Sequence, residues 1–229
     1  MSVSRAIRWL TNTGIFAVTA YAGYVAVGWL SYGRGGHTRD GEGDALLERL
    51  LPGHDVGERL QMRIAAPAAV TFQNLCTLNL LQSSLVQAIF RIREMAMGGD
   101  AQQRAMDVGL VDQAKLWGWR MLAVQPGVEI VFGAVTQPWV AHPIFHGLTA
   151  DQFMQFAAPG WVKIAWTLRV DPVDAVRSIA STETRVVATD QKARAKFRVY
   201  WALVAPGTLL IRFLALRQLK ARSERTAST

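Results

Sequence analysis

The feature that most constrains this chain is its C-terminal stretch, residues 178–222, which predicts a strand leading directly into a long helix. Ile179–Val187 is rich in β-branched residues, which favours a strand whose side chains alternate between two faces. Thr189 or Asp190 can cap the helix that follows, and Pro206-Gly207 inside that helix predicts a kink. A strand joined to a long amphipathic helix needs a sheet on which the helix can pack.

The preceding part of the chain contains the elements that such a sheet requires. Segments with alternating polarity or β-branched residues predict strands, and apolar segments with helical spacing predict helices. The predicted strands are Val56–Ile64, 119–125, 128–139 and Trp161–Val170, with a hairpin turn at Pro126-Gly127. The predicted helices are 44–51, 68–81 and 83–97. The predicted order is therefore one strand, two helices, several antiparallel strands and a long C-terminal helix.

The N-terminus contains an apolar segment, Thr13–Gly33, that carries no charge over about 20 residues, the length needed to cross a bilayer. A cleaved signal peptide is the alternative, because Ala20-Tyr21-Ala22 is a small-x-small site. Apolar residues continue past this site to Leu30, which favours an uncleaved anchor. The expected location is therefore a membrane, with a single-pass N-terminal anchor. Basic residues flank the segment on both sides, so the side of the membrane on which the domain lies stays open.

The positive charge of the protein is concentrated at its C-terminal end. The net charge is +8, and residues 191–229 alone hold nine Lys or Arg against Glu224, while the charges of residues 1–190 cancel. A basic terminal helix suits an anionic membrane surface or nucleic acid. Because no nucleic-acid recognition motif accompanies it, we expect no nucleic-acid partner. Val199–Leu216 could also be a second membrane span, but Arg212 near its middle would be costly in lipid.

The order of elements and the C-terminal residues resemble the START-like superfamily, also called SRPBCC, which includes polyketide cyclase/dehydrase-like and lipid-transfer proteins. The resemblance covers residues 55–222. The residues that carry it, in order, are Glu183, Thr184, Arg185, Asp190, Phe197, Tyr200, Trp201, Pro206, Gly207, Ile211 and Arg212. It implies an α+β helix-grip fold, in which a curved antiparallel sheet wraps on a long kinked C-terminal helix around an apolar cavity. In this chain an N-terminal transmembrane helix is expected to precede that domain. The predicted organisation is an anchor over residues 1–32, a linker over 33–54, the domain, and a tail over 223–229.

The candidate ligand-binding residues come from the last strand and the terminal helix. Glu183 and Arg185 share a strand face, so they should pair if that face is buried and are ordinary surface charges if it is solvated. If the face is inward, Tyr200 and Trp201 of the helix would lie opposite them, at the polar end of an apolar ligand. Phe132, Trp166 and Phe197 could line the cavity, although plain core packing fits their spacing equally well.

The sequence offers no catalytic constellation, and we expect neither a metal nor a cofactor. His142 and His146 have a helical i, i+4 spacing, but Pro143 lies between them and no third ligand is near. Cys76 lies in an apolar segment and is expected in the core. The favoured hypothesis is a membrane-anchored START-like protein that binds a hydrophobic small molecule or lipid without chemistry. The alternatives are a cyclase/aromatase-like enzyme using Glu183, Arg185 and Tyr200, and a membrane-tethered interaction protein without a ligand.

Overall fold

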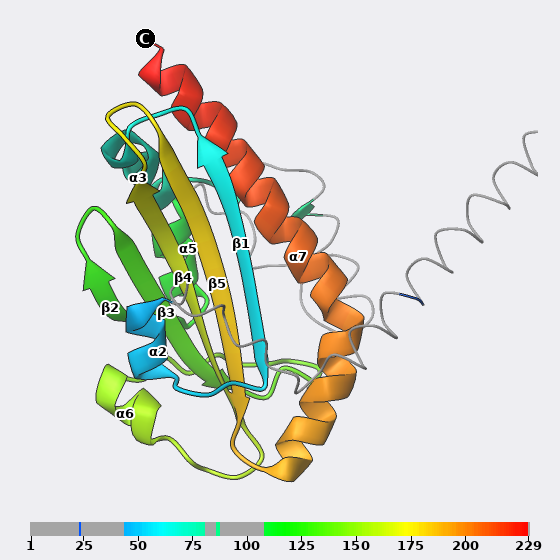
Figure 1. The fold of residues 1–229 in the computed structure, drawn as a ribbon. Helices are drawn as coiled ribbons and strands as arrows, with labels where there is room; N and C mark the ends of the chain where they lie inside the picture. The colour runs from blue at the N-terminus through cyan, green and yellow to red at the C-terminus, as the bar shows by residue number, and fades with distance from the viewer. Residues whose placement is uncertain (1–22, 24–43, 81–85, 88–107, 229) are drawn as a thin grey trace, which may run out of the picture.

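The computed structural model describes residues 23, 44–80, 86–87 and 108–228 (Figure 1). Five strands form one antiparallel sheet in the order β1-β5-β4-β3-β2. The strands are β1 (Val56–Ile64), β2 (Arg120–Gln125), β3 (Glu129–Thr136), β4 (Val162–Pro172) and β5 (Ser178–Ala188). The helices are α2 (Ala45–Leu50), α3 (Ala68–Cys76), α5 (Leu110–Leu116), α6 (Ala150–Gln155) and α7 (Gln191–Ala227). The predicted α+β class, antiparallel sheet and long C-terminal helix are confirmed. The predicted N-terminal transmembrane helix, and most of the helix predicted over residues 83–97, lie outside the described residues.

The strands form where the sequence pattern predicts them, and their pairing is regular. The first strand has the predicted limits, and the predicted hairpin forms between β2 and β3 around Pro126-Gly127. The β2–β3 register shifts at a bulge between Met121 and Ala123. The side chain of Leu122 there lies over Gly133 of β3, where the absence of a Cβ leaves room for it.

Helix α7 is continuous over 37 residues, and Asp190 caps its N-terminus by accepting a hydrogen bond from the backbone N–H of Ala193. Pro206 lies inside the helix without ending it, and Figure 1 shows the helix axis changing direction in its N-terminal half. The helix continues to Ala227, so the predicted tail is largely helical. Ser223 in that region is buried and accepts a hydrogen bond from Asn74 of α3 at 3.3 Å.

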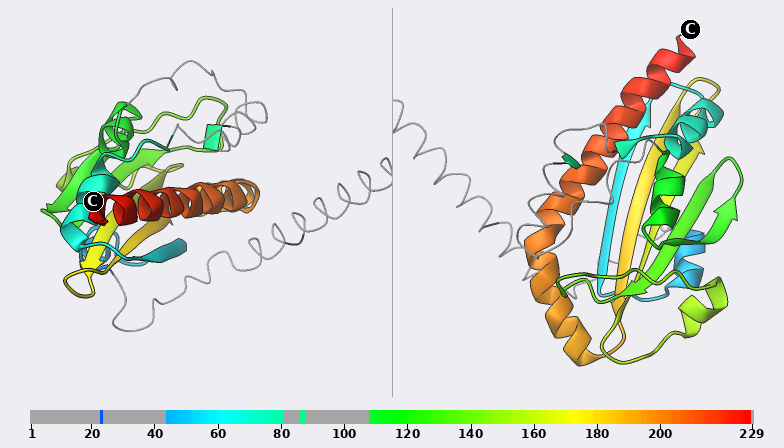
Figure 2. Two further views of the ribbon diagram at one scale, coloured as in Figure 1. Left: turned by 90° about the horizontal axis from the view of Figure 1, so that it is seen from above. Right: turned by 180° about the vertical axis from the view of Figure 1, so that it is seen from behind.

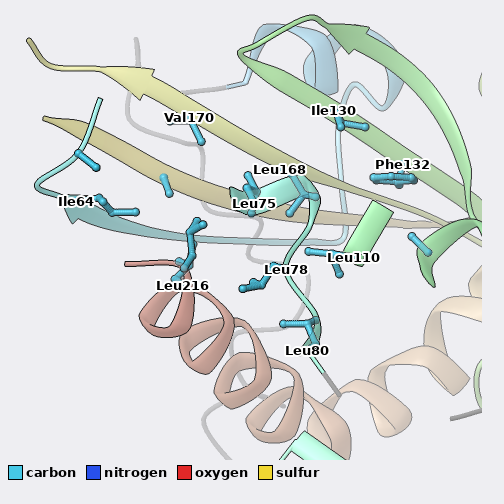
Figure 3. Packing of buried hydrophobic residues seen from close by; sticks show 14 of the residues in the cluster. Ile64, Leu75, Leu78, Leu80, Leu110, Ile130, Phe132, Leu168, Val170 and Leu216 are labelled. Carbon is cyan, nitrogen blue, oxygen red and sulfur yellow. The ribbon is translucent and has the colours of Figure 1, made fainter. Parts of the chain in front are cut away.

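The sheet has two covered faces. The inner face, as we call it, packs against α3, α5 and α7, and the outer face packs against α2 and α6 (Figures 1 and 2). Side chains of β3, β4 and β5 alternate between them, so even-numbered residues such as Phe132 and Leu168 point inward and odd-numbered residues such as Val131 and Val187 point outward. The inner face holds the largest apolar cluster. Figure 3 shows Leu168 and Phe132 of the sheet and Leu216 of α7 pointing into the same layer.

The outer face is closed by a short helix that the sequence placed in a linker. Asp44 caps α2, because its carboxylate accepts hydrogen bonds from the backbone N–H groups of Leu46 and Leu47. Leu47 and Leu50 of this helix are buried against the sheet. Residues 44–51 are therefore part of the packed domain, and the predicted linker over 33–54 includes a structural element.

Candidate functional site

The sheet separates the predicted site residues into two groups. Phe132, Trp166, Phe197, Tyr200 and Trp201 lie in the apolar clusters of the inner face. Glu183 and Arg185 are odd-numbered residues of β5 and point to the outer face, beneath α2. The structure therefore brings the five aromatic residues to one side of the sheet and the charged pair to the other.

The inner aromatic residues form two groups, one centred on β3 and β4 and one on the N-terminal part of α7. In one, Phe132 stacks on Trp166 with 4.6 Å between ring centroids, and Trp119 meets the edge of Trp166 at 5.9 Å. In the other, Phe197 lies 5.8 Å from Tyr200 and 5.6 Å from Trp201. Phe132 and Phe197 are fully buried, so they serve as core residues, while the tryptophans keep partial exposure.

The layer between α7 and the inner face is apolar but not fully closed. Leu60 and Met62 of β1 and Ile211, Leu214 and Ala215 of α7 all pack against the inner cluster while remaining partly exposed. A hydrophobic ligand can bind in such a layer by covering the apolar side chains that remain accessible to water.

A charged pair from α7 and β1 lies within this apolar layer. Arg212 of α7 donates from Nη2 to the backbone carbonyls of Glu58 and Thr182, each at 2.8 Å, and its Nη1 lies 3.4 Å from Glu58 Oε2. The Nε of Arg212 is buried and has no hydrogen-bond partner among the described residues. Burial lowers the pKa of Arg212 and raises the pKa of Glu58, the latter opposed by the Arg212 charge. These two residues are the polar end of the inner face.

The sequence did not identify this pair as a site. Arg212 was recognised as a charge that disfavours a membrane span, and Glu58 lies in a strand whose polarity alternates poorly. Two sequence features could have pointed to the pair. One is an arginine inside an apolar helical segment, and the other is a carboxylate at a position of β1 that faces the same side as its apolar residues. Only the pairing of β1 with β5, at the edge next to α7, brings the two residues together.

On the outer face, Arg185 is completely buried and forms ion pairs with two carboxylates. Its Nε donates to Glu183 Oε1 at 2.7 Å, and its Nη1 pairs with Glu48 of α2. Arg59 of β1 lies 3.7 Å from the second oxygen of Glu183. The expectation that Glu183 and Arg185 pair is confirmed. The expectation that Tyr200 and Trp201 lie opposite this pair is wrong, because α2 covers this face and supplies Glu48.

A second buried charge cluster lies beside the first. Glu129 of β3 is fully buried, and Arg169 of β4 donates to it at 3.1 Å while also binding Asp171 at 2.7 Å. Burial, reinforced by the nearby Asp44 carboxylate, raises the pKa of Glu129 to about 8. The hydrogen bonds from Arg169 to Asp171 raise the pKa of Arg169. Both outer clusters bind α2 and the sheet together.

The remaining chemistry candidates do not assemble into a site. His146 forms a backbone bridge with Val135 and lines a shallow surface pocket of about 490 Å³, together with Trp119 and Phe145. His142 is exposed in the same loop. No group of three or more His, Cys, Asp or Glu that could hold a metal ion occurs among the described residues. The acid–base candidates Glu183, Arg185 and Tyr200 lie on different faces of the sheet.

No protein-family model and no curated protein matches this chain. Similar solved structures include a hypothetical protein from Helicobacter pylori, at 11% identity over 77% of this chain and 93% of that one, with a TM-score of 0.35. A protein from Chromobacterium violaceum is 12% identical over 73% and 96%, with a TM-score of 0.29. An aromatase/cyclase from a Streptomyces species is 12% identical over 74% and 94%, with a TM-score of 0.27.

Proposed function

We propose that this chain is a START-like, helix-grip protein that binds a hydrophobic small molecule or lipid between α7 and the inner face of the sheet. The observation that carries the proposal is the incompletely closed apolar layer with one charged pair inside it. A ligand would cover the accessible parts of residues such as Leu60, Met62 and Leu214, at about 25 cal/mol for each Å² of apolar surface removed from water.

The polar end of the ligand would be acidic and would bind Arg212. The Arg212 side chain is only 14% exposed, and its Nε has no acceptor among the described residues. Its contact with Glu58 Oε2 at 3.4 Å is the longest of its hydrogen bonds, so a ligand carboxylate competes with Glu58 rather than with the backbone carbonyls. Because the pKa of Glu58 is raised, its carboxyl group can take up a proton when it is displaced.

The test is a titration of the delipidated full chain with a fluorescent fatty acid and, separately, a fluorescent sterol. Arg212→Met should weaken fatty-acid binding about tenfold or more, since a charge-assisted hydrogen bond is lost, and should leave sterol binding nearly unchanged. Arg177→Met, on the surface between β4 and β5 and outside α7, is the control and should change neither. If neither probe binds and mass spectrometry finds no co-purified molecule, the interaction-protein alternative replaces this proposal.

The N-terminal anchor belongs to the same proposal. It is supported by the uncharged segment Thr13–Gly33, which is long enough to cross a bilayer. Full-length protein should stay with the membrane fraction after an alkaline carbonate wash, and a variant lacking residues 1–32 should be released. A full-length chain that is itself released by the wash contradicts the anchor and leaves the ligand site untouched.

A further inference from the structure

The exposed side of α7 carries an apolar stripe with basic residues at both ends. Val199, Leu203, Leu210 and Phe213 follow one another at intervals of four, seven and three residues, so they share one side of the helix. They are 49%, 53%, 40% and 42% exposed. The stripe spans about 21 Å at the helical rise of about 1.5 Å per residue.

The same side of the helix continues in basic residues beyond each end of the stripe. Lys196 and Lys192 lie one and two turns before Val199, and Arg217 lies one turn after Phe213, all of them exposed. The Lys196 ammonium lies 6.0 Å from the centre of the Trp139 ring. The one acidic residue of α7, Glu224, is held by Lys220 at 2.6 Å. We name this surface, from Lys192 to Arg217, the α7 outer stripe.

We propose that the α7 outer stripe lies flat on the surface of a bilayer containing anionic lipids. An apolar stripe buried at the headgroup boundary and basic residues bound to anionic headgroups are the two parts of an interfacial helix. The inference is independent of the proposed ligand site, which lies on the other side of the helix.

Helix α7 would lie flat on the bilayer rather than cross it, because one side of the helix is packed on the sheet. Phe197, Leu216 and Leu219 are buried there, and Arg212 donates hydrogen bonds to the carbonyls of two strands. Crossing the bilayer would expose these contacts and place Arg212 in hydrocarbon. Of the described helices, α7 alone is long and apolar enough to span a membrane, but its inner side is already occupied.

The α7 outer stripe could also be covered by a second copy of the chain or by the chain's own N-terminal segment, but its basic charge favours anionic lipid over both. A second copy docked stripe to stripe would bring basic ends together in either the parallel or the antiparallel orientation, which is repulsive. The chain's own first 39 residues contain no Asp or Glu, so they offer apolar surface but nothing that complements Lys192, Lys196 and Arg217. Anionic lipid supplies both an apolar phase and negative charge.

The test uses the full chain with an environment-sensitive fluorophore on a single cysteine in a Cys76→Ala background. Labels at Val199→Cys and Leu210→Cys report on the stripe, and a label at Val124→Cys, 50% exposed on β2, is the control. The protein is added to vesicles of phosphatidylcholine, alone or mixed with phosphatidylglycerol. The two stripe labels should shift to the blue with the mixed vesicles, and the control label should not.

Two further arms separate the interpretations. Raised salt, and the triple variant Lys192→Glu/Lys196→Glu/Arg217→Glu, should each abolish the shift, because screening or reversing the charge removes the attraction. An equal shift with phosphatidylcholine alone overturns the proposal. A shift without vesicles also overturns it, in favour of a second copy if the shift depends on protein concentration and of the N-terminal segment if it does not. If no fluorescent fatty acid or sterol binds but the stripe labels still shift with the mixed vesicles, the proposed ligand site is rejected and the bilayer contact is not.

Discussion

At the scale of single residues, Arg185 is the side chain on which the outer face depends most directly. It has no exposed surface and binds Glu183 and Glu48. In Arg185→Ala, Glu48 can turn to water because it is 57% exposed, but Glu183 stays buried beside Arg59 alone. We expect the free energy of unfolding to fall by about 3–5 kcal/mol, which denaturant titration measures.

The matched control for Arg185 is Arg177, whose ion pair with Asp174 lies on the surface. Arg177→Ala should leave the denaturant midpoint unchanged within error, because exposed ion pairs are screened by water and salt. A near-wild-type midpoint for Arg185→Ala would mean that α2 does not enclose the pair.

Glu129 gives the protein a pH dependence of defined sign. Its pKa in the folded state is about 8, against an ordinary value of 4.5, so the folded protein holds a proton that the unfolded chain releases. The stability contributed is complete below the unfolded pKa and is lost as the pH rises towards 8, at no more than about 1.4 kcal/mol per pH unit. Glu129→Gln should flatten this decline.

The useful window for that measurement lies above pH 6.5. His54, whose pKa is lowered by burial and by the charge of Arg185, acts in the opposite sense below its ordinary value of 6.5. Above pH 6.5 the contribution of His54 fades, because the imidazole loses its proton in the unfolded state as well, and the difference in slope between wild type and Glu129→Gln reports Glu129. Wild-type protein that gains stability across this window would contradict the assignment.

At the scale of elements, the β2–β3 hairpin depends on a glycine that makes room for the bulge. A Cβ placed on Gly133 would lie 3.0 Å from Leu122 Cγ and 3.3 Å from Phe153 Cε2. Gly133→Ala should therefore destabilise the protein by about 1–3 kcal/mol, the usual cost of overpacking. In a Leu122→Ala background the same change should cost clearly less, and thermal unfolding of the four variants closes the cycle. Equal costs in both backgrounds would show that Leu122 is not the obstacle.

The elements themselves follow from the sequence better than their contacts do. The alternation of Trp161–Val170 predicts both the strand and its apolar face, and the structure places Ile164, Trp166 and Leu168 on that inner face. The same alternation cannot say which of two covered faces Arg185 occupies, because α2 comes from more than one hundred residues earlier in the chain. The periodicity of β5 predicted that Glu183 and Arg185 share a face but left open whether that face is buried, and the helix that covers it is α2 rather than α7.

At the scale of the whole molecule, the inner site was partly visible in the sequence. The five predicted aromatic residues gather on the inner face, since helical spacing in α7 and alternation in β3 and β4 both select that side. The pairing of Arg212 with Glu58 was not predicted, because it depends on the order of the strands in the sheet. No local pattern specifies that the first strand pairs with the last.

That strand order has a consequence for how the domain is made. Val56 pairs with Val186 and Ile64 with Ser178, so most of the domain's length must be synthesised before β1 has a neighbour. Until β5 has been made, the unpaired backbone groups of β1 can form hydrogen bonds with strands of other chains. Contacts so distant in sequence also slow the closing of the sheet. During translation β1 therefore stays unpaired until β5 has been made, and α7, which covers the inner face of both strands, leaves the ribosome only after β5.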